Sequence, residues 1–324
     1  MLYTPDNIKY CLLTWDYFEN QHVSQYISPS TPIPITGLFN WSILFNGSRT
    51  FPRSKTDFEK FNLLHVNVTQ KNLPLLSKII PLINQSVTKL LINIDYAIDM
   101  WSQTFPHPEL LLQEIDKADY IFAVEPSMTD LLSHSLKRKI ACIPHPCPTH
   151  LIENYRTHDR QKKIMISTHR YDSNFQLPYF ATRDLPDKWY TSILGASNNI
   201  DSVLHLYDEC QGVLTFEETI KYISRHYAII ETHTLNSYGR TTIEAAVLGV
   251  PCIGMKNLES MNRCFPTLIY NSLCPVTRIH KLINTLISDS DFYSSVCSFA
   301  IEKSLYYSYD NCKKLMLDFL NSPA

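Results

Sequence analysis

Residues 227–254, YAIIETHTLNSYGRTTIEAAVLGVPCIG, decide the fold that we predict for this chain. Residues 227–231 are mostly apolar, as expected of a short buried strand, and residues 240–248 follow a turn and predict a helix that Gly249 ends. Residues 250–253 are apolar again and predict a second strand, parallel to the first. A strand, a helix and a parallel strand in this order form a βαβ unit.

The turn between the first strand and the helix is the candidate binding site. Ligands of open α/β sheets bind outside the carboxyl ends of the strands, where a helix N-terminus offers free N–H groups and a positive dipole end. Gly239 gives the turn backbone freedom, Arg240 adds a positive charge whose donors suit phosphate, and the Glu244 carboxylate can accept hydrogen bonds from ribose hydroxyls. This corner predicts a phosphorylated ligand that carries hydroxyl groups.

An alternative interpretation of the same residues needs no ligand. Thr241 and Glu244 have the spacing of a capping box, in which Thr241 caps the helix and Glu244 accepts from its first N–H group. Gly249 is then only a helix end. The local pattern is compatible with both interpretations.

The unit as a whole resembles the donor-binding signature of GT-B glycosyltransferases of the retaining, glycogen-synthase-like clan (group 1, or family 4 type). The resemblance rests on residues 238–246, YGRTTIEAA, followed by residues 249–251, GVP. It implies that Glu244 binds the ribose of a nucleotide and that the glycine turn faces the diphosphate. The clan usually carries a second glutamate eight residues before the first one, where this chain has Asn236, so the sugar and the stereochemical outcome are left open.

The resemblance also implies the architecture. In the GT-B fold two Rossmann-like α/β domains, each a doubly wound parallel sheet, face a cleft, and the C-terminal helix crosses back to the first domain. Strand and helix patterns alternate along this chain, and residues 117–124, KADYIFAV, with residues 143–146, IPHP, are similar to the end of the clan's first domain. We expect an acceptor-side domain over residues 1–155 and a nucleotide-sugar-binding domain over residues 156–324, which suits a length of 324 residues.

Composition narrows the class of protein. A net charge of −2 gives no overall attraction to nucleic acid or to an anionic membrane.

The nine cysteines are odd in number, scattered and without a C-x-x-C pair, which indicates a reducing compartment and predicts a cytoplasmic protein. The chain has neither a signal-peptide core nor a run of eighteen apolar residues, so we expect no membrane span. Few glycines and many Ile, Asn, Tyr and Ser residues fit an AT-rich genome, such as that of a virus or phage acting in the host cytoplasm.

Polar residues after two other predicted strands are candidates for catalysis. Asp95 follows the strand expected over residues 90–94, where it would orient an acceptor hydroxyl or act as a general base, or else cap a short helix. His169 and Arg170 follow the strand expected over residues 163–167, where their charge would neutralise the leaving diphosphate, unless Arg170 only pairs with Asp172 at the surface. His65 and Glu125 are weaker candidates by the same logic.

The predicted site combines these residues. The catalytic set is Asp95, His169 and Arg170, and the donor-binding set is Asn236, Ser237, Tyr238, Gly239, Arg240, Thr241 and Glu244. Asn236 and Ser237 are expected to contact the sugar, and the Gly239 N–H group and Arg240 the diphosphate.

The predicted function is glycosyl transfer from a nucleotide diphosphate sugar, most simply a UDP-sugar, to an acceptor hydroxyl, with no cofactor and no metal required. A zinc site at Cys142, His145 and Cys147 is a weaker interpretation because the spacing matches no standard finger. The dehydrogenase, P-loop, hydrolase and zincin motifs are absent.

Two alternatives stay open at this point. One is a nucleotide-sugar epimerase or hydrolase of the same fold, and the other is an inactive protein that binds a nucleotide or a partner. The acceptor is open between DNA, protein and a small molecule. Modified DNA bases are a candidate if the source is a phage, and the basic residues Arg49, Arg53 and Lys55 are the local hint.

Overall fold

The computed structural model describes the chain except residues 1, 14–35, 51–53, 70–72, 84–85, 96–106, 168–173, 175, 187–188, 195–203, 213, 272 and 323–324. The chain forms two compact units. Of the described residues, unit 1 comprises those up to Cys147 and those from Tyr309 onward, and unit 2 comprises those within Pro148–Ser308. The chain therefore enters unit 2 after Cys147, earlier than the boundary expected between residues 155 and 156, and its last helix belongs to unit 1.

Unit 1 is built on one parallel sheet. Its described elements are β1 (Tyr10–Leu13), α2 (Asn40–Leu44), β2 (Ser48–Thr50), α3 (Lys55–Phe58), β3 (Leu63–Asn67), α4 (Leu73–Ile79), η1 (Ile80–Leu82), β4 (Lys89–Ile94), α6 (Pro108–Ile115), β5 (Tyr120–Ala123), α7 (Pro126–Leu136), β6 (Ala141–Cys142) and α15 (Tyr309–Leu320). The six strands lie in the order β2-β1-β3-β4-β5-β6, and all described pairs are parallel. The order reverses between β1 and β3, which makes that pair the switch point of the sheet.

The two faces of this sheet differ in chemistry because successive strand residues point to opposite faces. On one face Leu64, Ile92 and Ile121 pack in an apolar core with Leu76 of α4 and Leu111 of α6. The residues between them in the strands include the polar side chains of His65 and Asn93.

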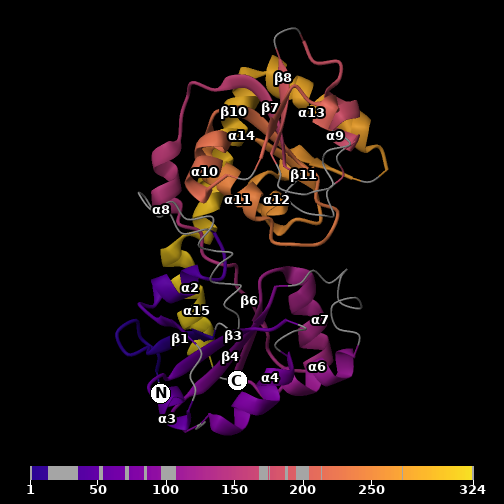
Figure 1. Ribbon diagram of the computed structural model, residues 1–324. Helices are drawn as coiled ribbons and strands as arrows, with labels where there is room; N and C mark the ends of the chain where they lie inside the picture. Colours follow the sequence, from indigo (N-terminus) through magenta and orange to yellow (C-terminus); the bar gives the residue numbers. More distant parts are fainter. Residues whose placement is uncertain are drawn as a thin grey trace. The chain divides into compact units, whose positions relative to one another are not determined.

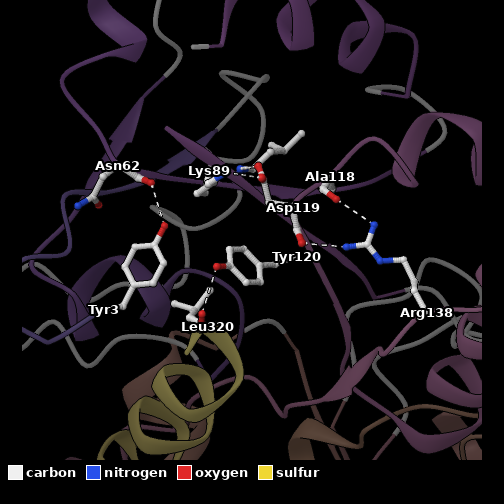
Figure 2. A network of polar contacts seen from close by, with 9 residues as sticks. Tyr3, Asn62, Lys89, Ala118, Asp119, Tyr120, Arg138 and Leu320 are labelled. Carbon is white, nitrogen blue, oxygen red and sulfur yellow. Dashed lines mark hydrogen bonds and ion pairs between the residues drawn. The ribbon is translucent and has the colours of Figure 1, made fainter. Parts of the chain in front are cut away.

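The C-terminal helix α15 is anchored to unit 1, as the GT-B prediction required. Figure 1 shows this yellow helix beside the indigo and violet strands of the N-terminal residues. The Tyr120 hydroxyl donates to the carbonyl oxygen of Leu320 over 3.1 Å (Figure 2). Tyr3 and Asn321 exchange two hydrogen bonds, from the Tyr3 N–H group to Asn321 Oδ1 over 2.6 Å and from Asn321 Nδ2 to the Tyr3 carbonyl over 2.8 Å.

Unit 2 is a second α/β layer structure. Its described elements are α8 (Thr149–Ile152), η3 (Glu153–Tyr155), β7 (Gln161–Ser167), α9 (Gln176–Thr182), β8 (Tyr190–Leu194), η4 (Leu204–Leu206), β9 (Glu209–Gln211), α10 (Phe216–Ser224), β10 (His226–Glu231), α11 (Arg240–Leu248), β11 (Cys252–Met255), α12 (Glu259–Cys264), η5 (Pro266–Leu268), β12 (Ile269–Tyr270), α13 (Pro275–Ser288), α14 (Ser290–Ser304) and η6 (Leu305–Tyr307). The strands form a parallel sheet in the order β12-β11-β10-β7-β8-β9. If β7 is taken as the first strand, this is the strand order of the Rossmann fold, and the order reverses between β7 and β10, which makes that pair the switch point.

The two parallel sheets confirm the predicted fold class. The residues just before the expected boundary at 155 form α8 and η3, which pack on α11. Arg156 Nε donates to the Val247 carbonyl over 2.5 Å, and Arg160 Nη2 donates to the Leu248 carbonyl over 3.1 Å. These two cations stabilise the C-terminus of α11, where the carbonyl groups and the helix dipole favour positive charge. In the described part of the chain, no helix is long and apolar enough to cross a membrane.

Candidate functional site

The predicted βαβ unit is formed by β10, α11 and β11. The helix α11 has the predicted bounds, Arg240–Leu248, and Gly249 ends it in the left-handed conformation with φ of +69°. The strands β10 and β11 pair in parallel. Because β10 lies beside β7 at the switch point, its carboxyl end and the N-terminus of α11 occupy the position at which Rossmann-ordered sheets bind their ligands.

The helix α11 begins without a side-chain cap. Its N-cap residue is Gly239, in the left-handed conformation with φ of +74°, and a glycine has no side chain that could accept from the first N–H groups of the helix. The capping-box alternative is therefore wrong, since Thr241 lies inside the helix and not at its cap. The N-terminus of α11 keeps donor groups at the positive end of the helix dipole, which suits an anion.

Gly239 is fixed in place by a neighbouring helix. Its carbonyl accepts a hydrogen bond of 3.0 Å from Ser260 Oγ, and Ser260, on α12, is completely buried. A Cβ atom at position 239 would overlap the same Ser260 Oγ. Both the positive φ and this close approach require glycine at the entry to the helix.

The loop before Gly239 is held by the residues that precede α12. The Ser237 N–H group donates to the Asn257 carbonyl over 3.3 Å, and the Glu259 N–H group donates to the Ser237 carbonyl over 2.9 Å. Asn257 Nδ2 donates to the Leu235 carbonyl over 2.5 Å. The backbone that carries Asn236 and Ser237, the predicted sugar-binding residues, is thus positioned by main-chain pairing rather than left as an open loop.

Tyr238 packs against an ordered group of side chains on α12 and η6. Its ring lies edge-on to the Tyr307 ring, with 6.5 Å between centroids. The Tyr307 hydroxyl donates to the Glu259 carboxylate, and Arg263 Nη2 lies 2.6 Å from the same carboxylate. Burial raises the pKa of Tyr307, so this hydroxyl stays a donor. Tyr238, predicted as a donor-binding residue, has this packing role in the structure.

Arg240 and Glu244 form the charged part of the corner. Glu244 is 2% exposed, whereas the Arg240 side chain is 43% exposed, and Arg240 Nε lies 3.7 Å from Glu244 Oε1. A cation in the first turn of a helix is disfavoured by the helix dipole unless an anion lies nearby. Glu244 supplies one such anion from within the helix, and the exposed guanidinium retains donors for a second.

In unit 1, Asp95 follows β4 directly and is held by two donors. Its Oδ1 accepts from Asn93 Nδ2 over 2.5 Å and from His145 Nε2 over 2.8 Å. Trp41 Nε1 donates to His145 Nδ1 over 3.0 Å. The side chain of Asp95 is 31% exposed, so its carboxylate is accessible at the carboxyl edge of the sheet. The helix that Asp95 was alternatively expected to cap falls on residues outside the described ranges.

The two weaker candidates of unit 1 have structural partners. His65 is completely buried between the Tyr10 hydroxyl at Nδ1 and Asn93 Oδ1 at Nε2, and burial lowers its pKa to about 3. Glu125 is the N-cap of α7, where its carboxylate accepts from the N–H groups of Ser127 and Met128 over 2.9 and 2.6 Å. Glu125 therefore acts in the structure as a helix cap.

Two predicted catalytic residues, His169 and Arg170, lie outside the described residues. The strand that precedes them, β7, ends at Ser167 next to β10 at the switch point of the sheet. Ser167 thus lies at the same edge of the sheet as the carboxyl end of β10, and the roles predicted for His169 and Arg170 stay predictions.

Solved structures similar to this chain share one architecture. The Anabaena protein HepE, crystallised with UDP and glucose, is 11% identical, with a TM-score of 0.69 over 98% of this chain and 100% of that chain. The sucrose-phosphate synthase of Thermosynechococcus elongatus is 14% identical, with a TM-score of 0.60 over 89% of this chain and 79% of its own. The α,α-trehalose 6-phosphate synthase of Burkholderia multivorans is 9% identical, with a TM-score of 0.63 over 80% of this chain and 71% of its own. The chain has the GT-B fold.

The GT-B assignment is carried by structure and not by sequence. No protein-family model matches the chain. No curated protein matches it either.

Two residues in the sheet of unit 2 were missed by the sequence analysis. Glu231 ends β10 and His233 follows it, with 3.0 Å between Glu231 Oε1 and His233 Nδ1, and both side chains are buried. The sequence did contain a signal for these residues, because an acidic residue ends an apolar strand and a histidine follows two positions later. Both residues lie at the carboxyl end of β10, the strand that leads to α11.

The zinc interpretation is not supported within the described ranges, where no three His, Cys, Asp or Glu side chains are placed to hold a metal ion. His145, its central residue, has its two ring nitrogens in hydrogen bonds with Trp41 and Asp95.

Proposed function

We propose that this chain is a glycosyltransferase that binds a UDP-sugar at the N-terminus of α11 and transfers the sugar to an acceptor hydroxyl. The observation that carries the proposal is the corner itself: an uncapped helix N-terminus at the switch point, entered through a left-handed glycine, with Arg240 and a buried Glu244 beside it. The fold supports it as well, since HepE, which shares the architecture, was crystallised with UDP and with UDP-glucose.

The diphosphate is assigned to the start of α11. Three features favour an anion there: the positive dipole end, a helix entry at Gly239 that has no N-cap side chain, and the exposed guanidinium of Arg240. Arginine suits this role because its planar fork of donors matches two phosphate oxygens. Thr241, which is buried in the first turn, contributes its N–H group rather than a cap.

The ribose is assigned to Glu244. Glu244 lies in the first turns of α11 beside Arg240, and a carboxylate there is an acceptor for the hydroxyl groups of a ribose. Asn236 and Ser237 then lie on the fixed loop before the glycine and are assigned to the sugar.

In the transfer, the bond between the sugar and the diphosphate breaks, a bond to the acceptor oxygen forms, and the acceptor hydroxyl loses its proton as UDP departs. His169 and Arg170 are assigned to the departing diphosphate and Asp95 to the acceptor hydroxyl. Catalysis then comes from positioning and from charge stabilisation of the leaving group, without a cofactor or a metal. The phage source, the DNA-base acceptor and the cytoplasmic location stay predictions.

A thermal-shift panel of UDP, GDP, ADP and CMP tests the donor site on the full chain. A nucleotide present at about one hundred times its dissociation constant adds roughly 2.7 kcal/mol of stability, or about 5 to 10 °C in the midpoint. We expect UDP to shift the wild type and Glu244→Gln to lose most of that shift. Glu302→Gln, which makes the same change on the exposed surface of α14, should keep it.

Two results would contradict the proposal. One is a panel in which no nucleotide shifts the midpoint, which would favour a partner-binding protein. The other is a UDP shift that is equal in the wild type and in Glu244→Gln. Turnover separates the remaining alternatives, because a transferase releases UDP from UDP-glucose faster when an acceptor is present, whereas an epimerase or hydrolase turns the donor over without one.

A further inference from the structure

Two chains of hydrogen bonds in unit 1 run toward the same atom, Asp95 Oδ1. The first chain begins at Trp41, whose indole nitrogen can only donate, so His145 Nδ1 is the acceptor of their 3.0 Å hydrogen bond. In neutral imidazole the proton then lies on Nε2, which donates to Asp95 Oδ1 over 2.8 Å. Trp41 thus fixes the tautomer of His145 that serves Asp95.

The second chain reaches Asp95 from the switch point of the sheet. A carboxylate only accepts, so the amide nitrogen of Asn93 donates to Asp95 Oδ1, over 2.5 Å, and Asn93 Oδ1 must accept from His65 Nε2, over 2.7 Å. His65 Nδ1 is then the acceptor for the Tyr10 hydroxyl. Tyr10 lies on β1, His65 on β3 and Asn93 on β4, so this chain crosses three neighbouring strands on one face of the sheet.

These residues differ sharply in exposure. Trp41, His65 and Asn93 are completely buried and His145 is 3% exposed, whereas the side chain of Asp95 is 31% exposed. The donors Asn93 and His145 both end on Asp95 Oδ1, so among the described residues none donates to Oδ2.

The network carries one formal charge. Burial keeps His65 neutral by lowering its pKa to about 3, and it keeps Tyr10 neutral by raising its pKa. Within the described residues no Lys or Arg side chain forms an ion pair with Asp95, and His145 contacts it as a hydrogen-bond donor through Nε2. The exposed end of the network is therefore a carboxylate that no Lys or Arg side chain of the described residues neutralises.

We propose that Asp95 Oδ2 binds a hydroxyl group of the acceptor, and that the acceptor is an uncharged sugar or polyol rather than a phosphate ester or a nucleic acid. The inference rests on the proposed transferase function and names its acceptor class. A hydroxyl or another donor completes the free oxygen of the carboxylate, whereas a phosphate beside it meets a like charge. Asn93 and His145 are positioning residues, since they hold Oδ1 and so fix the direction of Oδ2.

Ligand-observed NMR on the full chain with saturating UDP tests the acceptor class. The probes are three matched pairs: glucose and glucose 6-phosphate, fructose and fructose 6-phosphate, and glycerol and glycerol 3-phosphate, with a short DNA oligonucleotide beside them. We expect one neutral member to bind at least tenfold more tightly than its phosphate ester and than the oligonucleotide. Preference for a phosphate ester or for DNA, or binding of no neutral member, would overturn the inference.

Variants of Asp95 test whether its carboxylate causes the preference for a neutral ligand over its phosphate ester. Asp95→Asn keeps the shape and removes the charge, so we expect the preferred neutral ligand to bind roughly 10- to 100-fold more weakly and the discrimination against its ester to shrink. Asp6→Asn is the matched control, because Asp6 is exposed and precedes β1 at the opposite edge of the sheet. Equal affinities in the wild type and Asp95→Asn would overturn the inference.

The positioning role of His145 predicts rescue by one substitution and not by another. Glutamine places an amide donor near the Nε2 position, whereas phenylalanine keeps the ring without any donor. We expect His145→Phe to raise the KM for the acceptor about tenfold with little change in the KM for UDP-glucose, and His145→Gln to restore most of the loss. Equal acceptor KM values for the two variants would leave His145 with a packing role only.

The donor site keeps this test separate from the proposed function. Asp95 and His145 belong to unit 1, so their variants should show the full UDP thermal shift. If UDP fails to stabilise even the wild type, the proposed function fails. If UDP stabilises the chain but Asp95→Asn binds the neutral ligands normally, only the acceptor inference fails.

Discussion

Replacement of Gly239 by alanine tests whether the entry to α11 is as constrained as its geometry indicates. Gly239 has φ of +74°, a conformation that costs an L-residue about 1 to 2 kcal/mol. The new Cβ would also overlap Ser260 Oγ, so Ser260 must rotate and give up its buried hydrogen bond to the Gly239 carbonyl, a loss of about 1 kcal/mol. We expect the substitution to lower the free energy of unfolding by about 2 to 3 kcal/mol.

In a thermal melt of the full chain, this loss corresponds to a decrease of roughly 5 to 10 °C in Tm for a unit of this size. Gly212→Ala is the matched control, because no atom lies within 4 Å of the Cβ position at Gly212 and its φ is not positive. It should leave Tm nearly unchanged.

A double variant separates the two causes. Ser260→Ala alone should cost about 1 kcal/mol through the lost hydrogen bond, and it also removes the atom that the new Cβ meets. Gly239→Ala with Ser260→Ala should therefore cost about 1 kcal/mol less than the sum of the single changes. This explanation is refuted if Gly239→Ala and Gly212→Ala have the same Tm. It is also refuted if the double variant loses as much unfolding free energy as the two single variants together.

Three further outcomes follow from the contacts of single side chains. Burial lowers the pKa of His65 to about 3 in the folded chain, whereas its pKa in the unfolded chain is about 6.5. Between these two pH values the unfolded chain binds a proton that the folded chain does not, so the free energy of unfolding falls as the pH decreases from about 6.5 toward 3. Between pH 7.5 and pH 5 we expect His65 to account for about 2 kcal/mol of that loss in urea unfolding, and a His65→Gln variant with the same pH slope as the wild type would contradict it. Glu125→Ala should lower the free energy of unfolding by about 1 to 2 kcal/mol, because α7 loses its N-cap, while the UDP thermal shift persists. An unchanged melting midpoint would contradict the capping role of Glu125. Arg240→Gln should weaken UDP about tenfold in titration calorimetry and leave uridine, which has no phosphate, unaffected; equal weakening of both would remove Arg240 from the diphosphate.

The sequence was sufficient for the βαβ unit of β10, α11 and β11 because its signals there are local. Gly249 ended the predicted helix at the right residue, since a left-handed glycine stops a helix by its own conformation. The start of α11 was harder. The Thr241 and Glu244 pattern is a common cap, and only the approach of Ser260 from α12 shows why Gly239 takes that position.

Short exposed elements left little signal. The strand β2, Ser48–Thr50, is exposed at all three residues and lies at the edge of its sheet, so no alternation of apolar residues marks it. The strand β4, by contrast, is buried along nearly its whole length and was predicted within one residue.

Among the residues around Asp95, too, only those with a local sequence signal could be identified from the sequence. Asp95 could be selected because it directly follows a buried strand. Its partner His145 is 50 positions away and Trp41 is 104 positions from His145, so their hydrogen bonds depend on the order of strands in the sheet. Sequence patterns of a few residues do not contain that order.

The most direct test of the account is a crystal structure of the full chain with UDP. We predict that the ribose hydroxyls lie within hydrogen-bonding distance of the Glu244 carboxylate and that the diphosphate contacts the Gly239 and Arg240 N–H groups at the start of α11. UDP bound elsewhere, or bound with its phosphates directed away from α11, would contradict the proposed donor site and with it the proposed function.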